Sequence, residues 1–267
     1  LERPIPGAPR SDLTCCYPLL CLSNWDELPT DIESLANGPV SLVAVIDPLA
    51  RVPEKLLEAA FPDVRRMFKQ HMLADLGEPR EAFVAKRHQR NTRHALDAMN
   101  VEPTSNPKQW ASEWQRLYAS LIVRHHITGL QAFSERSLEL QLDVPGAVAF
   151  RATDGVATLG MLVFYVSGNR AYYHLGAHSE DGYKLGSSFA LFWEAFAWLA
   201  GNGVETVDLG AGAGLVANEE DGLARFKEGW ANRRAAALLC GRILDRQAYD
   251  QLAKPGSEFF PSYRSPG

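Results

Sequence analysis

The chain has 267 residues, 46% of them hydrophobic, and a formal net charge of −5. This composition can fill the core of one large domain or two small ones, and the acidic balance excludes a global basic field that would hold nucleic acid. No stretch of about 18 consecutive apolar residues occurs, so the sequence predicts no transmembrane helix. The cysteines Cys15, Cys16, Cys21 and Cys240 lack the spacing of a zinc site or a disulfide framework, so we expect reduced thiols in a cytoplasmic protein.

The first half of the chain predicts alternating strands and helices after a flexible, proline-rich segment at residues 1–12. We expect a buried strand at 40–47, a helix over 54–69 that Pro62 must interrupt, and a second strand at 70–76. The following elements, read from helical spacing and turn residues, are helices at 79–99, 107–127 and 134–142, with a short strand at "NVEP" (100–103).

From Gly146 onward the pattern indicates an antiparallel meander. Three strand-like runs, 147–152, 156–167 and 170–177, are joined by "DG" and "GN", which are hairpin turn signals. A long helix follows, for which Ser187 or Ser188 is the expected cap. The chain then predicts, in order, a strand at 204–209, a short helix at 220–230, a strand at 233–244 and a last helix at 245–254.

A glycine-rich segment, "TVDLGAGAG" (206–214), raises the possibility of a methyltransferase, in which an acidic strand end and a glycine turn hold S-adenosylmethionine. The context argues against that interpretation. Such a loop follows the first strand of a doubly wound sheet, whereas here residues 215–267 hold one clear strand and antiparallel hairpins precede the loop. We therefore expect Gly210 to form the wall of a substrate site and not an adenosyl site.

Three other motifs, "RAYYHLGAH", "SSFALFWEAFAWLAGNGVETVDLGAGAG" and "DGLARFKEGWANRR", resemble the GNAT superfamily of N-acetyltransferases, and within it the Fem-type and CelD-like acyltransferase branch. The resemblance covers most of residues 40–245. It implies an α+β fold with a mixed sheet, the GNAT-type N-acetyltransferase fold. The expected organisation is a flexible segment (1–12), a reduced N-terminal α/β half resembling a partial second copy (13–105), an acyltransferase-like domain (106–255) and a C-terminal tail (256–267).

The same resemblance implies an N-acyltransferase that moves an acyl group from a thioester, acyl-coenzyme A as donor substrate, to an amine on a small molecule or a cell-envelope precursor. An aminoacyl-tRNA-dependent peptidyltransferase of the Fem type is one alternative, and tRNA is the only nucleic acid that we would then expect. A non-catalytic binding module of the same fold is another. We expect no permanently bound cofactor and no metal.

Candidate catalytic residues are Lys227, Asp208 and His126. In the Fem-type branch the lysine that matches Lys227 is implicated in stabilising charge on the reacting carbonyl; the alternative is a solvated lysine paired with Glu228 or Glu220. Asp208 ends a strand and could orient the amine or take its proton, or could simply bond the backbone of its own loop. His126, in "RHH" (124–126), could accept a proton or form a polar helix end.

Candidate binding residues fall in two groups. The segment "EDGYKLGSS" (180–188) occupies the expected place of a phosphate-binding loop, although it departs from the usual superfamily motif, and an ordinary helix start is the alternative. The donor-binding candidates there are Gly182, Tyr183, Lys184, Gly186, Ser187 and Ser188. The acceptor-binding candidates are Arg90, Arg93, Tyr173, Gly210, Phe226 and Trp230, of which the arginines also fit a solvated basic helix face.

Overall fold

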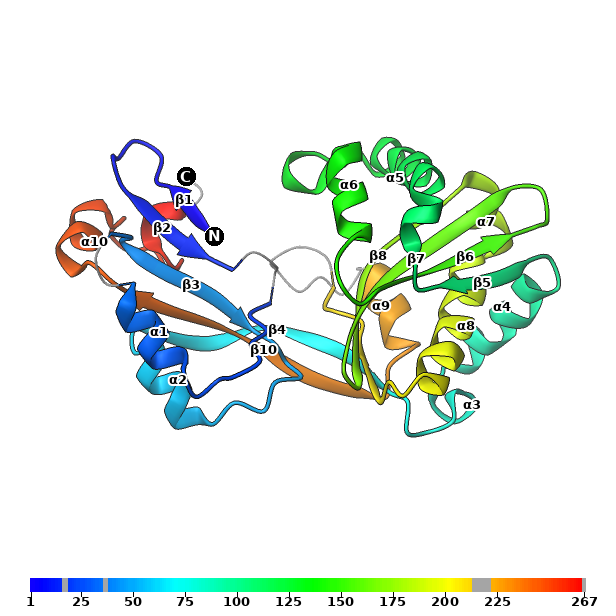
Figure 1. Ribbon diagram of the computed structural model, residues 1–267, viewed down its shortest axis with the longest axis horizontal. Helices are drawn as coiled ribbons and strands as arrows, with labels where there is room; N and C mark the ends of the chain where they lie inside the picture. The colour runs from blue at the N-terminus through cyan, green and yellow to red at the C-terminus, as the bar shows by residue number, and fades with distance from the viewer. Residues whose placement is uncertain (16–18, 36–37, 213–221, 266–267) are drawn as a thin grey trace. The chain divides into compact units, whose positions relative to one another are not determined.

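The structure, a computed structural model, describes residues 1–15, 19–35, 38–212 and 222–265 (Figure 1). The chain divides into two compact units, residues 1–70 with 235–267 and residues 71–234. These boundaries differ from the expected halves at 13–105 and 106–255. The reason is that strand β4 (Val64–Asp75) crosses from the first unit into the second, and strand β10 (Arg233–Ile243) returns from the second to the first.

The first unit is built on strands in the order β1-β2-β3-β10. Its elements, apart from β4 and β10, are β1 (Glu2–Pro4), β2 (Ser11–Thr14), α1 (Leu28–Ser34), β3 (Ser41–Ile46), α2 (Glu54–Ala60), α10 (Arg246–Leu252) and η3 (Ser262–Arg264). Side chains alternate between two cores along β10, because successive residues of a strand face opposite sides. Cys240 packs with α1 and α2, and Leu239 packs with α10 and the C-terminal segment.

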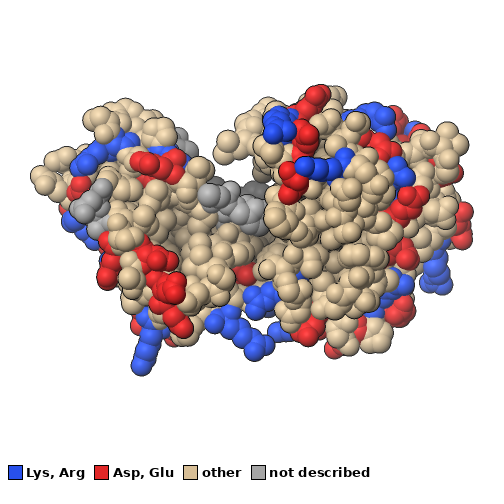
Figure 2. All heavy atoms as spheres, viewed as in Figure 1, with Lys and Arg blue, Asp and Glu red and all other residues tan. Residues whose placement is uncertain are grey.

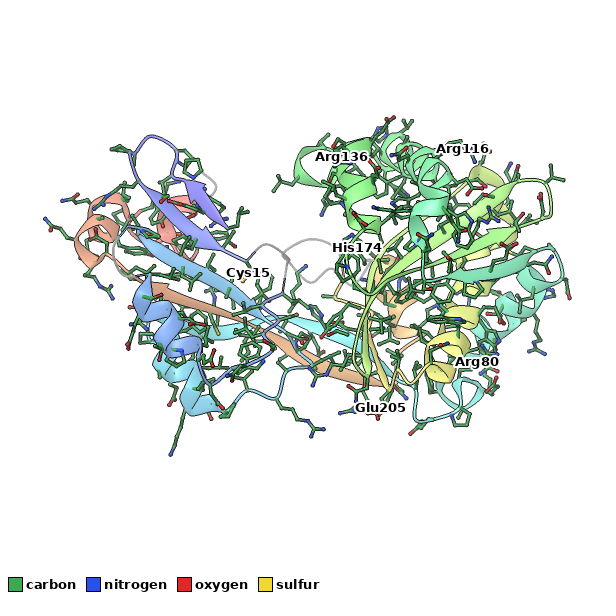
Figure 3. The ribbon with its side chains drawn as sticks, viewed as in Figure 1. Cys15, Arg80, Arg116, Arg136, His174 and Glu205 are labelled. Atoms are coloured by element: carbon green, nitrogen blue, oxygen red, sulfur yellow. The ribbon has the colours of Figure 1, made fainter. Side chains whose placement is uncertain are left out.

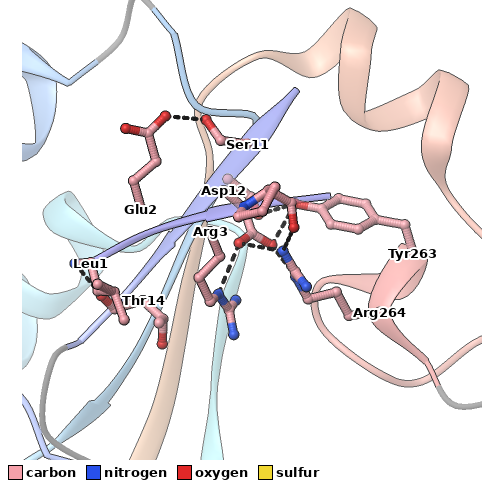
Figure 4. Close-up of polar contacts among 10 residues, drawn as sticks. Leu1, Glu2, Arg3, Ser11, Asp12, Thr14, Tyr263 and Arg264 are labelled. Atoms are coloured by element: carbon pink, nitrogen blue, oxygen red, sulfur yellow. Dashed lines mark hydrogen bonds and ion pairs between the residues drawn. The ribbon is translucent and has the colours of Figure 1, made fainter. Parts of the chain in front are cut away.

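The two chain ends are ordered, in contrast to the flexible segment expected at residues 1–12. The Asp12 side chain is fully buried and accepts hydrogen bonds from Arg3 Nε at 3.0 Å, Arg264 Nε at 2.5 Å and the Tyr263 hydroxyl at 3.2 Å (Figure 4). A buried carboxylate must be paired to be tolerated, and here both cationic partners come from the ends of the chain. This contact fixes β2 to the C-terminal segment.

The predicted helix over 54–69 is only half present. Helix α2 ends at Ala60, just before Pro62, and residues from Val64 onward form β4. Proline disfavours helical backbone in the residue before it, and the pyrrolidine ring cannot donate to the helix, so the chain leaves the helix there. The strand expected at 70–76 is the second part of β4.

The second unit is a mixed sheet in the order β4-β9-β8-β7-β6-β5, with helices on both faces (Figure 1). Its strands besides β4 are β5 (Asn100–Thr104), β6 (Ala147–Thr153), β7 (Thr158–Ser167), β8 (Arg170–His178) and β9 (Thr206–Asp208). Its helices are α3 (Arg80–Phe83), α4 (Lys86–Leu96), η1 (Pro107–Trp110), α5 (Ala111–His125), η2 (Gly129–Gln131), α6 (Glu135–Leu142), α7 (Glu180–Leu185), α8 (Ser187–Gly201) and α9 (Gly222–Glu228). Among the described residues of this unit, neighbouring strands pair antiparallel except β8 with β9, which pair in parallel.

Two cores cover the faces of this sheet. Along β7, Leu162 and Phe164 pack with α8, while Met161 and Val163 pack with α5 and α6. The central helix α8 is apolar around most of its circumference because it lies between the sheet and helix α4. The meander, α6, α8, α9 and β10 follow the sequence prediction closely, and the predicted α+β fold is confirmed. The predicted helix at 79–99 is two helices, broken at Val84 and Ala85, and helix α7 was not predicted.

Candidate functional site

Strands β8 and β9 diverge in the sheet of the second unit. They pair in parallel only from Arg170↔Thr206 to Tyr172↔Asp208, where β9 ends, whereas β8 continues to His178. After Asp208 the chain stays with β4 instead: Leu209 N donates to Met72 O at 2.9 Å, and Gly210 O accepts from Met72 N at 3.1 Å. Beyond Tyr172, β8 therefore no longer pairs with β9.

A β-bulge coincides with this divergence. The register between β7 and β8 shifts between Val163 and Phe164, so that His174 is the extra residue on β8. A bulge reverses which face the following side chains occupy. Tyr173 accordingly packs with the α8 core, but Leu175, two residues further on, packs with the α5 core. The His174 side chain lies toward α6, where its Nε2 is 2.9 Å from Gln141 Oε1 (Figure 3).

Lys227 occupies the place where the strands diverge. Its side chain, on α9, is only 8% exposed. The Nζ atom donates a hydrogen bond to the Ala211 carbonyl at 2.8 Å and lies 5.7 Å from the centroid of the Tyr173 ring, close enough for a cation–π interaction. The ammonium thus lies between the chain leaving β9 and Tyr173, the first residue of β8 beyond the last pair with β9. Buried lysines are rare in proteins, so this position makes Lys227 a candidate functional residue.

The alternative interpretation of Lys227 as a solvated surface residue is wrong. Glu228, the expected partner, forms its ion pair with Arg234, and Glu220 lies outside the described residues. The sequence did not show this burial, because the groups that cover Lys227 come from β8 and from the loop after β9.

Aromatic packing anchors helix α9, and this gives Phe226 and Trp230 structural positions. Trp230 is fully buried in the core of the second unit, so it does not form the acceptor contact that was expected of it. His88 of α4 donates from Nε2 to the Phe226 carbonyl at 3.0 Å. Gly229 faces the same imidazole: a Cβ there would lie 2.3 Å from the His88 ring. Helix α4 therefore holds the end of α9 and with it Lys227.

Asp208 is 3% exposed and uses both of its side-chain oxygens within the protein. Its Oδ1 accepts from Gly210 N at 2.7 Å, as in the simpler of the two sequence interpretations. The carboxylate also contacts His71 Nδ1, at 3.0 Å from Oδ1 and 2.9 Å from Oδ2. His71, on β4, is 8% exposed and was not singled out from the sequence. Its only signal there was a histidine within the strand-like run "QHMLADL".

Tyr173 presents a hydroxyl group rather than a phenolate at this site. Burial, and secondarily the neighbouring Tyr183, raise the pKa of Tyr173 far above its usual value. Gly176 makes room for the hydroxyl, since a Cβ at that position would be 2.6 Å from the Tyr173 oxygen. A neutral tyrosine can donate a hydrogen bond to a carbonyl oxygen or an oxyanion.

The segment expected to form a phosphate-binding loop is mostly helix α7. Ser179 caps this helix by accepting from Gly182 N at 3.0 Å, and Gly186 N bonds to Tyr183 O, so both glycine N–H groups have partners within the turn. A Cβ on Gly182 would lie 1.8 Å from Leu159 O, which shows that this glycine permits close packing of α7 on β7. Gly186 has φ +71° and links α7 to α8, a conformation that suits glycine.

The remaining donor-site candidates have ordinary structural contacts. The exposed Lys184 pairs with Glu180 and Asp181 of its own helix, each at 3.1 Å. Ser187 is fully buried and its Oγ lies 2.8 Å from His178 Nδ1, whereas Ser188 is partly buried on α8. The Tyr183 ring packs under Arg124, whose guanidinium carbon is 4.1 Å from the ring centroid.

His126, Arg90 and Arg93 lie on exposed surfaces. His126 is in the left-handed region at φ 51° and its N–H closes the end of α5 on Ile122 O, which matches the polar helix-end interpretation. The two arginines lie on the exposed face of α4. Figure 2 shows basic and acidic side chains interspersed on the visible faces of the two units.

Two features are absent from residues 1–15, 19–35, 38–212 and 222–265. There, no three His, Cys, Asp or Glu side chains come together in a group that could hold a metal ion. In those ranges, too, no helix combines the length and apolar character needed to traverse a bilayer. Cys240 is a buried free thiol.

Comparison with solved structures supports the fold. The crystal structure of FemX superposes with a TM-score of 0.71 at 12% identity, covering 94% of this chain and 85% of that one. The C-terminal domain of a protein named as a lysylphosphatidylglycerol synthetase, from Agrobacterium fabrum, gives a TM-score of 0.57 at 17% identity over 78% of this chain and 69% of the other. L-PGS from Bacillus licheniformis gives a TM-score of 0.55 at 16% identity, covering 77% of this chain and 68% of that one.

Comparison of the sequence with families and with curated proteins gives two results. No curated protein matches the chain. The family model described as "Acetyltransferase (GNAT) domain" matches residues 49–228 of the 267, a range that contains Lys227, Asp208, Tyr173 and His71. The chain belongs to the GNAT acetyltransferase family.

Proposed function

We propose that this protein is an N-acyltransferase that moves an acyl group from a thioester donor, acyl-coenzyme A, to an amine. The reaction would occur where β8 and β9 diverge. The observation that carries this proposal is the buried Lys227 ammonium, held between the Ala211 carbonyl and the Tyr173 ring. Membership of the GNAT family supports acyl transfer in general; the donor and the acceptor are part of the proposal.

The chemistry assigns a role to each of these groups. Attack by the amine on the thioester carbonyl forms a C–N bond and places negative charge on the carbonyl oxygen. A fixed ammonium at Lys227 would stabilise that developing charge in a site with little water, where such an interaction is strongest. The neutral Tyr173 hydroxyl is a second possible donor to the oxygen. Collapse of the intermediate breaks the C–S bond and releases the thiolate.

The part of β8 that extends beyond β9 supports a donor with amide groups, because β9 ends opposite Tyr172 and β8 continues to His178. An extended pantetheine-like chain could align with such an edge as an added strand does. Helix α8 begins at Ser187, directly after α7. Because the N-terminus of a helix carries a partial positive charge, the start of α8 provides a favourable location for phosphate groups. The donor phosphates would then interact with the start of α8 rather than with an open glycine loop.

An aminoacyl donor is the second candidate. The specific support is the similarity in fold to FemX, which extends over 94% of the chain, and to two proteins named as lysylphosphatidylglycerol synthetases. In that case the same Lys227 would act on an ester carbonyl instead of a thioester. The acceptor in either case is an amine, on a small molecule or a cell-envelope precursor.

Hydrogen–deuterium exchange with and without saturating acetyl-coenzyme A tests the donor and its position together. We expect slower exchange in peptides that cover residues 173–178 of β8, because a bound donor would lie along the part of β8 that extends beyond β9. S-adenosylmethionine is the matched control and should protect neither this edge nor residues 209–212. Protection by acetyl-coenzyme A only outside β8 and the start of α8, or protection of 209–212 by S-adenosylmethionine, would overturn the proposal.

A further inference from the structure

A buried histidine–aspartate pair, His71 of β4 and Asp208 at the end of β9, borders the segment that Lys227 of α9 contacts. The antiparallel register of β4 and β9 places Leu73 opposite Asp208, and the preceding residue of β4, Met72, bonds to both Leu209 and Gly210. Gly210 in turn adjoins Lys227: a Cβ on Gly210 would be 3.3 Å from Nζ. The loop that receives the lysine is therefore the loop that the His71–Asp208 pair borders.

The contacts of the pair determine which imidazole nitrogen carries the proton in neutral His71. The Asp208 carboxylate lies 2.9 and 3.0 Å from Nδ1 and, as an anion, can only accept. Nδ1 therefore donates, and Nε2 is left with its lone pair. Asp208 is itself held by Gly210 N at 2.7 Å, so both the tautomer and the orientation of the ring are fixed. This is the arrangement by which a carboxylate prepares a histidine to act as a base.

A purely structural link between β4 and β9 would not require this pair, because the two strands already pair through their backbones from Leu73↔Asp208 to Asp75↔Thr206. Placing two ionisable groups inside a protein is costly, and a well-packed apolar pair would usually serve packing better. The His71 side chain also retains 11% of its accessible surface, so the ring is not sealed from solvent or ligand.

We propose that His71 is the proton acceptor of the reaction and that Asp208 is the residue that positions it. This inference rests on the proposed acyl transfer. As the amine forms its C–N bond, Nε2 of His71 takes one proton from the nitrogen. The C–S bond then breaks and the thiolate leaves with the electron pair, and the imidazolium returns its proton to the thiolate or to water. Asp208 thus acts through His71 and not directly on the amine.

Chemical modification tests the free lone pair without any substrate. Diethyl pyrocarbonate acylates an unprotonated imidazole nitrogen, and mass spectrometry locates the product. We expect His71 to react within about tenfold of the exposed His94 and His126 near neutral pH, and much faster than His178, whose Nδ1 is held by the Ser187 hydroxyl. Asp208→Asn should slow the reaction of His71 by about tenfold or more. The substitution replaces one carboxylate oxygen, which can accept from Nδ1–H, with an NH2 group, which can only donate. Modification of His71 no faster than that of His178 would overturn the assignment.

Steady-state kinetics with acetyl-coenzyme A and a set of primary amines gives the matching functional test. His71→Asn retains an amide N–H near the position of Nδ1 and so preserves the bond to Asp208, while it removes Nε2. We expect kcat to fall by about 10²- to 10⁴-fold with a smaller change in KM, and added imidazole to restore part of the loss. A His71→Asn variant with kcat within a few-fold of the parent contradicts the proposal, even if donor protection at β8 shows that the proposed function is correct. If instead the parent protein is inactive with this donor, the modification experiment still decides the state of His71.

Discussion

His178 should make the stability of the second unit depend on pH. Its side chain is partly buried at the end of β8, its Nδ1 lies 2.8 Å from the Ser187 hydroxyl, and its ring centroid lies 5.3 Å from that of Tyr183. Burial lowers its pKa from 6.5 to about 4. Because the folded-state pKa lies below the unfolded one, the unfolded chain binds more protons between these values. The contribution of His178 is therefore complete above about pH 6.5 and is lost as the pH falls toward 4.

The size of this pH effect on stability follows from the lowered pKa of His178. Between about pH 7.5 and about pH 5 the unfolded state gains a proton that the folded state does not, which should cost roughly 2 kcal/mol of unfolding free energy. Urea unfolding at these two pH values, followed by tryptophan fluorescence, measures the loss. Five of the six tryptophans lie in the second unit, so the signal mainly reports on it.

A His178→Asn variant is the control for this measurement. Asparagine keeps a polar atom near Ser187 but does not titrate. His174, whose pKa burial also lowers to about 4, contributes equally to the parent and the variant, so the difference between them isolates His178. The parent should lose roughly 2 kcal/mol more than the variant on acidification. An equal loss in both proteins would refute the assignment of a buried, neutral His178.

Two glycine substitutions should have opposite effects on unfolding free energy. Gly182→Ala places a methyl group 1.8 Å from Leu159 O, so α7 must move off β7, and we expect a loss of roughly 1 to 3 kcal/mol in urea unfolding. Gly201→Ala lies at the end of α8 with nothing within 4 Å of the added Cβ and should be neutral or should stabilise by up to about 1 kcal/mol. Equal effects at the two sites would show that α7 is not packed as described.

Local signals in the sequence were sufficient for much of the fold. The "DG" and "GN" turns defined the meander, and the apolar run of α8 and the family resemblance gave the central architecture. Helix α7 was missed because Gly182 and Gly186 suggested a loop. The first of these glycines is required by Leu159 O, a contact 23 residues away in the chain that no local pattern reveals. The ordered chain ends were missed for the same reason, since Asp12 is paired with Arg264, 252 residues away.

The candidate site was predicted only in part. Lys227 and Asp208 were selected from motifs, and the structure places both beside the loop that follows β9. His71 could not be selected, because its partner Asp208 is 137 residues away and the pairing depends on strand register. The supposed phosphate-binding loop and the exposed His126 were chosen by composition and position, which do not report whether backbone donors are already used within a turn.

Turnover of Lys227→Met is the most direct test of the central claim that this buried ammonium stabilises charge on the reacting carbonyl. Methionine keeps much of the side-chain volume and removes the charge. With the donor that protects β8, we expect kcat to fall by roughly ten- to a thousandfold with a smaller change in KM, as for loss of one oxyanion donor. The melting temperature should be unchanged or higher, because a buried charge is removed. Lys55→Met, at an exposed lysine of α2 in the first unit, should stay within about twofold of the parent. Near-normal turnover of Lys227→Met would contradict the account.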